Sequence, residues 1–197
     1  MRRRACYHRV ALGAGSVNIL SSFKFVHAAD LHLDSPLLGL ASKSAHYAAR
    51  IEAASREAFD NLIDLTINEQ CRFLLLSGDI FDGDLRNFQT GLYFMDGMRR
   101  LGEAGVQVYM LLGNHDAENR FAPKLKLSAN VHIFPKDQAA SFYLEDIGVA
   151  LHGRSFARYD ITENLAASYP APNLAQFNIG LLHTACEGSE GHHARYA

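Results

Sequence analysis

The 197-residue sequence has few cysteines, no large excess of either charge and no long apolar run. Its three cysteines, Cys6, Cys71 and Cys186, are odd in number and far apart, which excludes a disulfide framework and a CxxC metal knot. A reducing cytoplasm is the location that this pattern predicts. No stretch reaches the roughly 18 to 20 apolar residues of a membrane-spanning helix, so we expect no membrane association.

The lack of positive charge bears on nucleic-acid binding. The formal net charge is -2 and the sequence pI is near 6.5, unlike the basic footprint of a protein that holds nucleic acid by charge alone. If the protein acts on DNA, local groups and metal ions must hold the substrate. Hydrophobic residues make up 48% of the chain, which is ample for the core of one domain.

Residues 1–22 differ in composition from the rest of the chain. An arginine-rich start precedes a mildly apolar stretch, which superficially resembles a signal peptide. Glycine and polar residues interrupt this stretch, and no clear small-residue cleavage site follows it. We therefore expect residues 1–22 to be a loosely ordered leader or a non-native start, and residues 23–197 to form the domain.

Short apolar segments alternate with amphipathic ones in the first half of the chain. The pattern predicts strands at residues 23–29, 73–76 and 106–112, and helices at residues 44–69 and 88–101. Strands that alternate with helices pair in parallel through right-handed crossovers. The first half therefore predicts a parallel sheet.

The second half has a different pattern, with short strands and few helical stretches. Candidate strands lie at residues 131–134, 141–145, 149–152 and 178–183. We expect these strands to form another sheet that packs on the first. The predicted fold class is α/β, with two facing mixed sheets flanked by helices.

The first three predicted strands each end in residues that can bind a metal ion. Ligands of open α/β sheets gather at the carboxyl ends of strands, so these segments should meet in one crevice. Oxygen and nitrogen donors without thiolates suit Mn²⁺, Fe²⁺ or Zn²⁺. One such pair is common by chance as a helix cap or surface turn, but three in order favour a metal site. The residues are Asp30 and His32, then Asp79 and Asp82, then Asn114, His115 and Asp116.

Local geometry supports this interpretation. Asp30 and His32 are two apart in an extended segment, so both side chains point to the same side and can bind one cation. Gly78 and Gly113 permit the tight turns from strand to loop that bring the backbone close to a phosphate.

These blocks resemble the signature of a known enzyme family. Residues 30–32, 78–82 and 113–116 resemble the DxH, GDxxD and GNHD blocks of calcineurin-like metallophosphoesterases, in the same order. Residues 179–183 resemble the fourth block, an apolar strand that ends in a histidine ligand. The resemblance implies an α/β/β/α sandwich and makes residues 23–197 a partial metallophosphoesterase domain.

Within the family, two segments are most similar to the branch of SbcD and YhaO, which are DNA-repair exonuclease subunits. One is residues 26–36 and the other is residues 182–184. This resemblance implies a nuclease that hydrolyses DNA phosphodiesters, with an SMC-like ATPase subunit of the SbcC type and a second copy of the chain as partners.

The resemblance also implies a site for two divalent cations. Asp79 would bridge both cations, Asp30 and His32 would complete one ligand set, and Asn114 and His183 would serve the other. Mn²⁺ is the expected metal, with Mg²⁺, Fe²⁺ and Zn²⁺ as alternatives. Two cations about 3.5 to 4 Å apart can polarise a phosphodiester and lower the pKa of a water molecule.

His115 has the catalytic role in this scheme. By resemblance it would stabilise the transition state or protonate the leaving alkoxide, and Asp82 would orient it. Asp116 is a further candidate for the same network. Arg154 and Ser155 could contact a phosphate, although a solvated turn is the simpler interpretation.

One family block has no convincing copy. The fifth block, GHxH, supplies one histidine ligand to each metal. Gly191, His192 and His193 follow His183 too closely and lack the second histidine at the required offset. We expect residues 188–197 to be a loop and the missing histidines to lie beyond the printed sequence, so the site as printed would be incomplete and the printed chain a poor or inactive nuclease.

Two alternative functions stay open at this point. The same metal core serves phosphoesterases that act on small phosphodiesters or phosphoproteins. The chain could also be a truncated, non-catalytic module that only binds a partner. Substrate preference would test the first alternative, and metal content the second.

Overall fold

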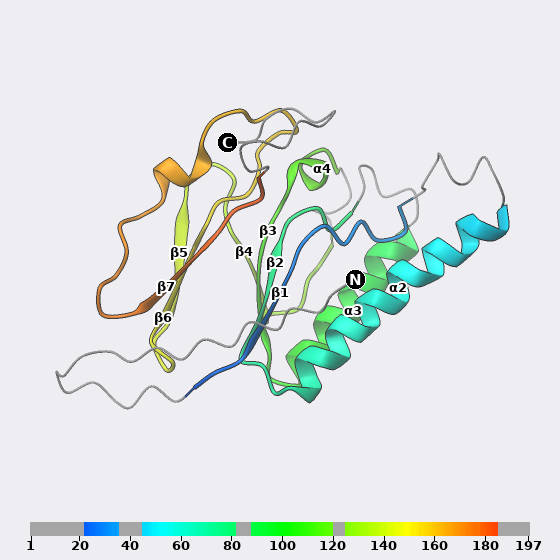
Figure 1. The fold of residues 1–197 in the computed structure, drawn as a ribbon, viewed down its shortest axis with the longest axis horizontal. Helices are drawn as coiled ribbons and strands as arrows, with labels where there is room; N and C mark the ends of the chain where they lie inside the picture. The colour runs from blue at the N-terminus through cyan, green and yellow to red at the C-terminus, as the bar shows by residue number, and fades with distance from the viewer. Residues whose placement is uncertain (1–21, 36–44, 82–87, 120–124, 185–197) are drawn as a thin grey trace.

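Two facing β-sheets and two long helices form the part of the chain that the structure describes. The computed structural model describes residues 22–35, 45–81, 88–119 and 125–184. Both long helices cover the outer face of one sheet, and the other sheet lies on its opposite face (Figure 1). The expected α/β fold of two sheets flanked by helices is confirmed.

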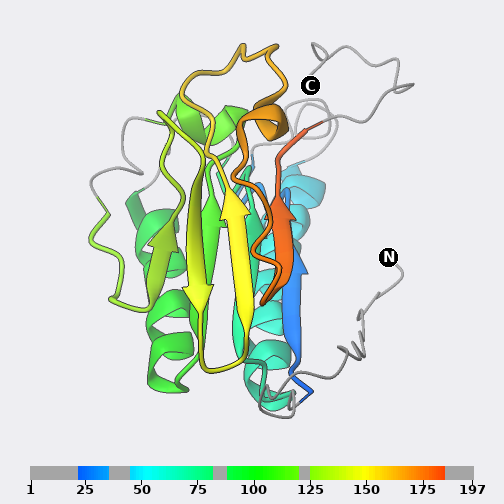
Figure 2. The same ribbon diagram turned by 90° about the vertical axis from the view of Figure 1, so that its left-hand side faces the viewer.

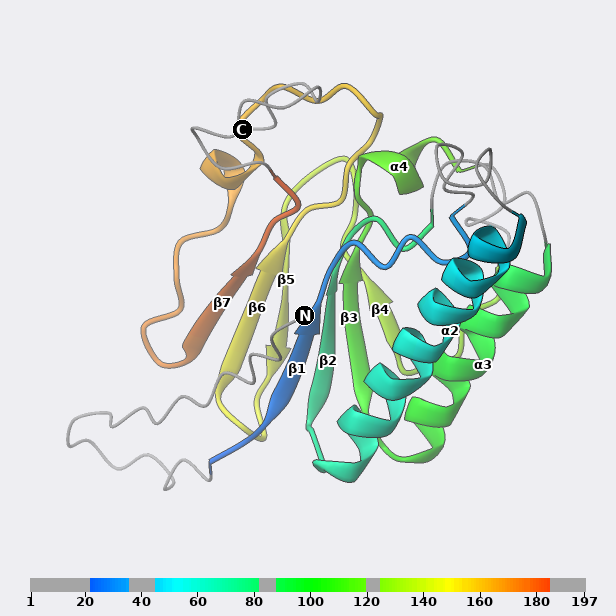
Figure 3. The same cartoon turned by 45° about the vertical axis from the view of Figure 1, so that its right-hand side comes forward.

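The first sheet is wholly parallel in the described residues. Across the sheet, its strands are β1 (Phe25–Ala28), β2 (Phe73–Ser77), β3 (Gln107–Leu111) and β4 (Val131–Ile133). Ala28 pairs with Leu76, Leu76 with Met110, and Met110 with Ile133. The carboxyl ends of all four strands therefore lie at the same edge of the sheet (Figure 3).

β4 corrects one prediction, because the sequence pattern placed residues 131–134 in the second sheet. The strand pairs in parallel with β3 instead. Asn130 precedes it and is buried, and its side-chain amide donates hydrogen bonds to the carbonyl oxygens of Met98 and Val106, at 3.1 and 3.0 Å. These long-range bonds hold the start of β4 beside β3. No local pattern in the sequence indicates them.

The second sheet is mixed, as predicted (Figure 2). It contains β5 (Ala140–Leu144), β6 (Val149–Gly153) and β7 (Phe177–Leu181). β5 and β6 form an antiparallel hairpin, whereas β7 pairs in parallel with β6 after a connection that contains the short 3₁₀ helix η2 (Leu165–Ser168). This connection brings the end of β7 to the same end of the molecule as the carboxyl ends of the first sheet.

The space between the sheets holds one apolar cluster. All five residues of β2 are buried because one face of the strand meets the helices and the other meets the second sheet. The cluster contains Phe73, Leu75, Tyr109 and Leu111 from the first sheet, and Leu144, Val149, Leu151 and Leu181 from the second sheet or its edge.

The helices α2 (Ala45–Asn68) and α3 (Phe88–Glu103) bury a second cluster against the first sheet. Their bounds lie within two residues of the predicted ones. No helix in the described ranges is long and apolar enough to cross a membrane. The contact residues are Phe59 and Ile63 of α2, Phe94 and Met98 of α3, and Leu74, Leu76, Val108 and Met110 of the sheet.

Some expectations concern residues that the structure does not describe. All but the last residue of segment 1–22 lies outside the described ranges, as do Asp82, His192, His193 and the whole of residues 188–197. The expectations for the leader, for the orientation of His115 by Asp82 and for the residues after His183 therefore stay predictions.

Candidate metal centre

The segments after β1 and β2 run side by side at the carboxyl end of the first sheet. The backbone amides of Asp30, His32 and Leu33 donate hydrogen bonds to the carbonyl oxygens of residues 78–80, at 3.1, 3.0 and 3.0 Å. These bonds continue the pairing of the two strands past their ends. The loop that carries Asp30 and His32 is therefore joined to the loop that carries Asp79.

The backbone of these loops is strained at the residues that face the centre. Asp30, His32 and Asp79 have φ angles of 55°, 41° and 51°, in the left-handed region that residues other than glycine seldom adopt. Such conformations cost on the order of 1–3 kcal/mol each and persist only where the surroundings enforce them, often at functional sites. The unfavourable φ angles are therefore kept because they place the side chains of these three residues at the centre.

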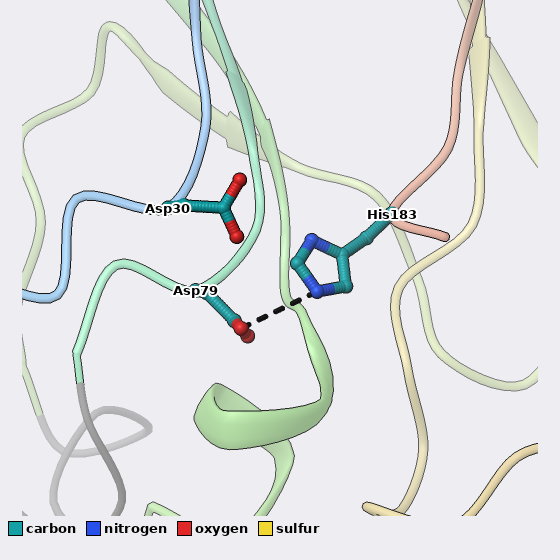
Figure 4. A group of neighbouring side chains, drawn as sticks. All are labelled: Asp30, Asp79 and His183. Atoms are coloured by element: carbon teal, nitrogen blue, oxygen red, sulfur yellow. Dashed lines mark ion pairs between the residues drawn. The ribbon is translucent and has the colours of Figure 1, made fainter. Parts of the chain in front are cut away.

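Three metal-binding side chains converge there (Figure 4). Asp30, Asp79 and His183 each offer one donor atom, and these atoms lie within 4.8 Å of one another. Asp79 Oδ2 lies 3.4 Å from His183 Nε2 and 3.7 Å from His32 Nε2. Asp79 is therefore close to both histidines, as a bridging ligand would be.

The remaining predicted ligand, Asn114, lies beside His183. Its Oδ1 is 3.0 Å from His183 Nε2, and Asn114 is buried at the start of the short helix α4 (Asn114–Ala117). His32 Nε2 lies 4.0 Å from Asp30 Oδ1. The five predicted ligands thus meet in one place, and all of them line the same cleft.

A hydrogen bond to the backbone of Ser77 sets the orientation of the His183 ring. Its Nδ1 lies 2.9 Å from the carbonyl oxygen of Ser77, which can only accept a hydrogen bond, so Nδ1 carries a proton and donates it. Nε2 then faces Asp79 and Asn114. A histidine that ligates a metal through one nitrogen commonly donates its other N–H to a backbone carbonyl or carboxylate.

Electrostatics couple Asp79 and His183. Burial raises the pKa of Asp79, but the hydrogen bond and charge of His183 outweigh burial, so the pKa lies below its ordinary value. Burial lowers the pKa of His183, but the hydrogen bond and charge of Asp79 outweigh it, so that pKa lies above its ordinary value. The pair favours an ionised Asp79, the form that binds a cation, and a protonated His183, which must lose its proton before it can bind one.

Two glycines make this close approach possible. Gly78 has a φ of 87°, and a Cβ there would lie 2.7 Å from His183 Nδ1. A Cβ on Gly113 would lie 2.2 Å from Asp79 Oδ1. Both distances are far shorter than real Cβ contacts, so any side chain at either position would displace a proposed ligand.

Asp116 holds the loops together from below the centre. Its carboxylate accepts hydrogen bonds from the backbone amides of Ile80, Phe81 and Gly113, each at 3.0 Å. The side chain is buried, and burial raises its pKa. Asp116 therefore links the two loops that carry Asp79 and Asn114, and its partners among the described residues are backbone amides rather than the ring of His115.

His115 lines the cleft beside the proposed ligands. Its backbone amide donates a hydrogen bond to Asp79 Oδ1 at 3.1 Å. Its ring packs edge to face against His32, with centroids 5.3 Å apart, and against Tyr159, with centroids 5.4 Å apart. The ring thus stands beside the proposed ligands, as a group that acts on substrate would.

A cleft of about 360 Å³ opens above these residues. Its lining includes every predicted ligand, His115, and His27 with Ser77. His27 Nε2 lies 2.8 Å from Ser77 Oγ, and burial lowers the pKa of His27. His27 was not among the site residues predicted from the sequence. It lies two residues after Phe25, which packs between the sheets, and this alternation along β1 is the signal that could have placed it on the same face.

Two other predicted candidates are structural. Ser155 is buried, donates through Oγ to the carbonyl oxygen of Phe134 at 2.5 Å, and accepts from the amide of Leu112 at 3.0 Å. Arg154 donates to the carbonyl oxygen of Lys136 at 3.4 Å. Neither residue lines the cleft, so neither is placed to contact a phosphate there.

The donor set fits divalent cations. Three carboxylate or amide oxygen ligands and two imidazole nitrogens converge on a small polar cleft, and no thiolate is present among the lining residues. Such a mixed set suits Mn²⁺, Fe²⁺, Zn²⁺ or Mg²⁺ rather than a structural zinc knot. Carboxylates at this spacing would repel one another without positive charge between them.

Comparison with known proteins agrees with the geometry. A family model described as calcineurin-like phosphoesterase matches residues 23–184, which span all the proposed ligands. An uncharacterized metallophosphoesterase, YhaO of Bacillus subtilis, is 37% identical over 177 residues, covering 88% of this chain and 43% of the relative. The DNA double-strand break repair protein Mre11 of Methanopyrus kandleri is 21% identical over 181 residues, covering 84% of this chain and 38% of the relative.

Among solved structures, a dimetal phosphatase from Danio rerio is similar with a TM-score of 0.43 and 17% identity, over 66% of this chain and 43% of that one. The chain spans less than half the length of both curated relatives.

Proposed function

The chain belongs to the calcineurin-like phosphoesterase family, and we propose that it is the catalytic part of a DNA-repair nuclease that hydrolyses phosphodiesters with two divalent cations. Family membership supports a dinuclear-metal phosphoesterase. The choice of DNA as substrate is the finer step, supported by the described role of the Mre11 relative in double-strand break repair.

The observation that carries the proposal is the convergence of five donors, one of which is Asp79. Donor atoms of Asp30, Asp79 and His183 lie within 4.8 Å of one another, and His32 and Asn114 lie beside them. As the family resemblance implies, Asp30 and His32 would hold one cation and Asn114 and His183 the other, with Asp79 shared. Cations bound there would neutralise the phosphate charge and help to activate a water molecule for attack.

The protein itself would supply positioning and a proton. Hydrolysis forms a bond from a water oxygen to phosphorus and breaks the bond from phosphorus to the leaving alkoxide. His115 would donate its proton to that alkoxide, because its ring lines the cleft beside the ligands without being one of them. The hydrogen bond from its backbone to Asp79 fixes its distance from the centre.

A substrate comparison tests the proposal. The chain as printed and a form extended through a GHxH block, both loaded with Mn²⁺, would be assayed on linear duplex DNA, on a small phosphodiester such as bis(p-nitrophenyl) phosphate, and on a phosphoprotein. In the extended form, which all kinetic tests below also use, we expect metal-dependent cleavage of DNA that EDTA abolishes and that Asp30→Asn greatly weakens. Asp137→Asn, in an exposed turn far along the chain, is the matched control and should behave as the wild type.

The other outcomes favour the alternatives. Cleavage of small phosphodiesters or phosphoproteins without cleavage of DNA would show a phosphoesterase of another substrate class. Failure to bind two Mn²⁺ ions per chain, measured by calorimetry, together with no hydrolysis of any substrate would favour a non-catalytic module. Hydrolysis that does not depend on metal would overturn the proposal altogether.

Two protein partners are also proposed. The family resemblance implies an SMC-like ATPase subunit of the SbcC type and a homodimer. Size-exclusion chromatography with light scattering would test the dimer, and co-purification with an SbcC-type ATPase subunit would test the other. A monomer that binds no such ATPase would exclude both.

A further inference from the structure

The segment between β6 and η2 passes directly behind the metal centre. We call residues 154–164 the support loop. Its start is fixed by backbone hydrogen bonds, from Ser155 N to the carbonyl oxygen of Pro135 at 2.9 Å and from Phe156 N to that of Leu112 at 2.8 Å. Leu112 directly follows β3 and precedes Asn114 and His115 by two and three residues, so the loop is attached to the backbone that carries these residues.

A small apolar cluster fills the space between the support loop and the centre. Its buried members are Phe156, Ile161 and Leu165. Ala117 and Leu182 pack against them. Ala117 ends the helix that carries His115, and Leu182 directly precedes His183, so the cluster supports both histidines through their chain neighbours.

Two aromatic rings of the support loop then contact the histidines themselves. Phe156 packs edge to face on the ring of His183, with centroids 5.6 Å apart and an angle of 89°. Tyr159 packs in the same way on His115, with centroids 5.4 Å apart and an angle of 79°. One loop therefore contacts a proposed ligand and the proposed proton donor.

The turn that carries Tyr159 is itself held in shape. Arg158 forms an ion pair with Asp160, with Nε and Oδ1 3.1 Å apart, and lies 3.9 Å from Glu163. Arg158 and Asp160 are exposed, whereas Tyr159 between them is half-buried. The ring of Tyr159 is thus partly covered although its neighbours are exposed, and it contacts the ring of His115.

We propose that Tyr159 is a positioning residue for His115, and that the support loop keeps this ring in line with the leaving group. The inference rests on the proposed role of His115. His32 contacts the ring of His115 from one side and Tyr159 contacts it from another, so removal of Tyr159 would widen the range of ring orientations. Aromatic pairs of this geometry favour defined ring arrangements.

The leaving group gives a test that a merely structural role would not pass. An alkoxide, as released from DNA, needs a proton as its bond breaks, whereas p-nitrophenolate leaves readily without one. Loss of a positioned acid therefore slows the first reaction much more than the second. Misplacement of a catalytic group by about 1 Å can cost about 10²-fold in rate.

The expected result for Tyr159→Ala is a fall in kcat of about 10- to 10²-fold on DNA, with KM changed less than about 2-fold. With bis(p-nitrophenyl) phosphate, the change in kcat should stay below about 3-fold. Tyr159→Phe keeps the ring and should behave as the wild type. Tyr143→Ala, an exposed tyrosine on the second sheet, is the matched control.

A cycle with His115→Ala separates this inference from the proposed function. If Tyr159 acts through His115, Tyr159→Ala should have no further effect in a His115→Ala background. If His115→Ala alone leaves the rate on DNA unchanged, the proposed role of His115 fails. If His115→Ala slows DNA cleavage and Tyr159→Ala does not, only the positioning role fails.

A measurement without substrate completes the test. In a ¹³C-histidine-labelled chain, the ring resonance of His115 can be assigned by its loss in His115→Ala. It should shift in Tyr159→Ala, because the neighbouring ring current is removed, and stay in place in Tyr159→Phe and Tyr143→Ala. A resonance that does not move in Tyr159→Ala would overturn the proposal, whatever the activity of the variant.

Discussion

The two ends of the first sheet differ in what their clefts contain. The cleft at the carboxyl end is about 360 Å³, and the cleft at the amino end is about 1000 Å³. In the larger cleft, Arg72 pairs with Asp146 and Tyr109 stacks on His132. These groups form separate pairs, whereas in the smaller cleft donor atoms of Asp30, Asp79 and His183 lie within 4.8 Å of one another. Cleft size is therefore the poorer guide to the site in this molecule.

Backbone conformation separates the two ends as clearly. At the amino end, Gln70 and Gly105 have positive φ angles of 54° and 77°, and each follows a helix, where a left-handed residue is an ordinary way to end it. At the carboxyl end, Asp30, His32 and Asp79 follow strands, so the end of a helix does not account for their positive φ angles. A positive φ angle is therefore informative about the site only where it does not simply end a helix.

Removal of one carboxylate at each end should separate the two clefts most clearly. Asp79→Asn should reduce the cation content of the dialysed chain by at least about 10-fold and bring hydrolysis below detection, because both proposed cations share this ligand. Elemental analysis measures the first effect and a DNA cleavage assay the second. Asp146→Asn is the control at the amino end and should change neither. Unchanged cation content in Asp79→Asn would refute the bridging role.

A histidine at each end gives the next largest effect. His115→Ala should keep its cations but lose about 10²- to 10⁴-fold in rate, the usual contribution of a positioned acid or base. His132→Ala, in the larger cleft, should leave the rate within about 2-fold of the wild type. Steady-state kinetics with excess Mn²⁺ would show the contrast. Full activity in a metal-replete His115→Ala variant would reject the role in catalysis.

A glycine at each end tests how closely the backbone is packed there. Gly113→Ala places a Cβ against Asp79 and should cost about 1–3 kcal/mol of stability, with cation affinity at least about 10-fold weaker. Gly105→Ala has nothing within 4 Å of the added Cβ and a φ of 77°, so it should cost about 1–2 kcal/mol from its backbone conformation alone. Thermal unfolding and calorimetric Mn²⁺ titration measure both. Equal cation binding in the two variants would contradict the expectation.

A final contrast concerns an ion pair at each end. Asp34 accepts two hydrogen bonds from Arg56, at 2.8 and 2.6 Å, and one from Thr90 at 2.5 Å, which anchor the loop of Asp30 and His32 to both helices. Asp34→Asn should lower the free energy of unfolding by about 1.5–3 kcal/mol at pH 7, the range for hydrogen bonds to a charged group. The exposed pair of Arg72 and Asp146 should contribute less than about 1 kcal/mol.

The pH dependence of this effect has a definite sign. Burial raises the pKa of Asp34, but the hydrogen bonds from Arg56 and Thr90 outweigh it, so the pKa in the folded protein is lowered. The stabilisation is therefore complete above the unfolded pKa of about 3.9 and is lost as the pH falls through the lower folded value. Urea unfolding from pH 7 to pH 2 should show the wild type and Asp34→Asn converging in acid. A constant difference would exclude this linkage.

Much of the site could be predicted from the sequence because its ligands follow strands. A buried strand that ends in polar residues is visible as a local pattern, and parallel pairing brings such ends together. Asp30, His32, Asp79 and Asn114 were placed in this way and His183 by the family resemblance, and the structure brings all five to one cleft. The extended conformation predicted for Asp30 and His32 is wrong, because both residues have φ angles in the left-handed region.

The rest depended on contacts between distant residues. Tyr159 lies in an irregular loop, and nothing near it in the sequence indicates that it contacts His115. The assignment of β4 to the wrong sheet had the same cause, because the buried amide of Asn130 binds two carbonyls more than 20 residues away, with separations of 24 and 32 residues. Local patterns identify elements and their ends, whereas such pairings appear only once the chain has folded.

The hydrogen bonds between the loops after β1 and β2 have a consequence for amide exchange. The amides of Asp30, His32 and Leu33 are bonded to the neighbouring loop just as strand amides are bonded within the sheet. They should exchange with solvent as slowly as those of β1 and β2, although catalytic loops are usually among the first parts of a protein to open. The centre then opens only together with the sheet, and its shape is set when the two strands pair, before any cation binds.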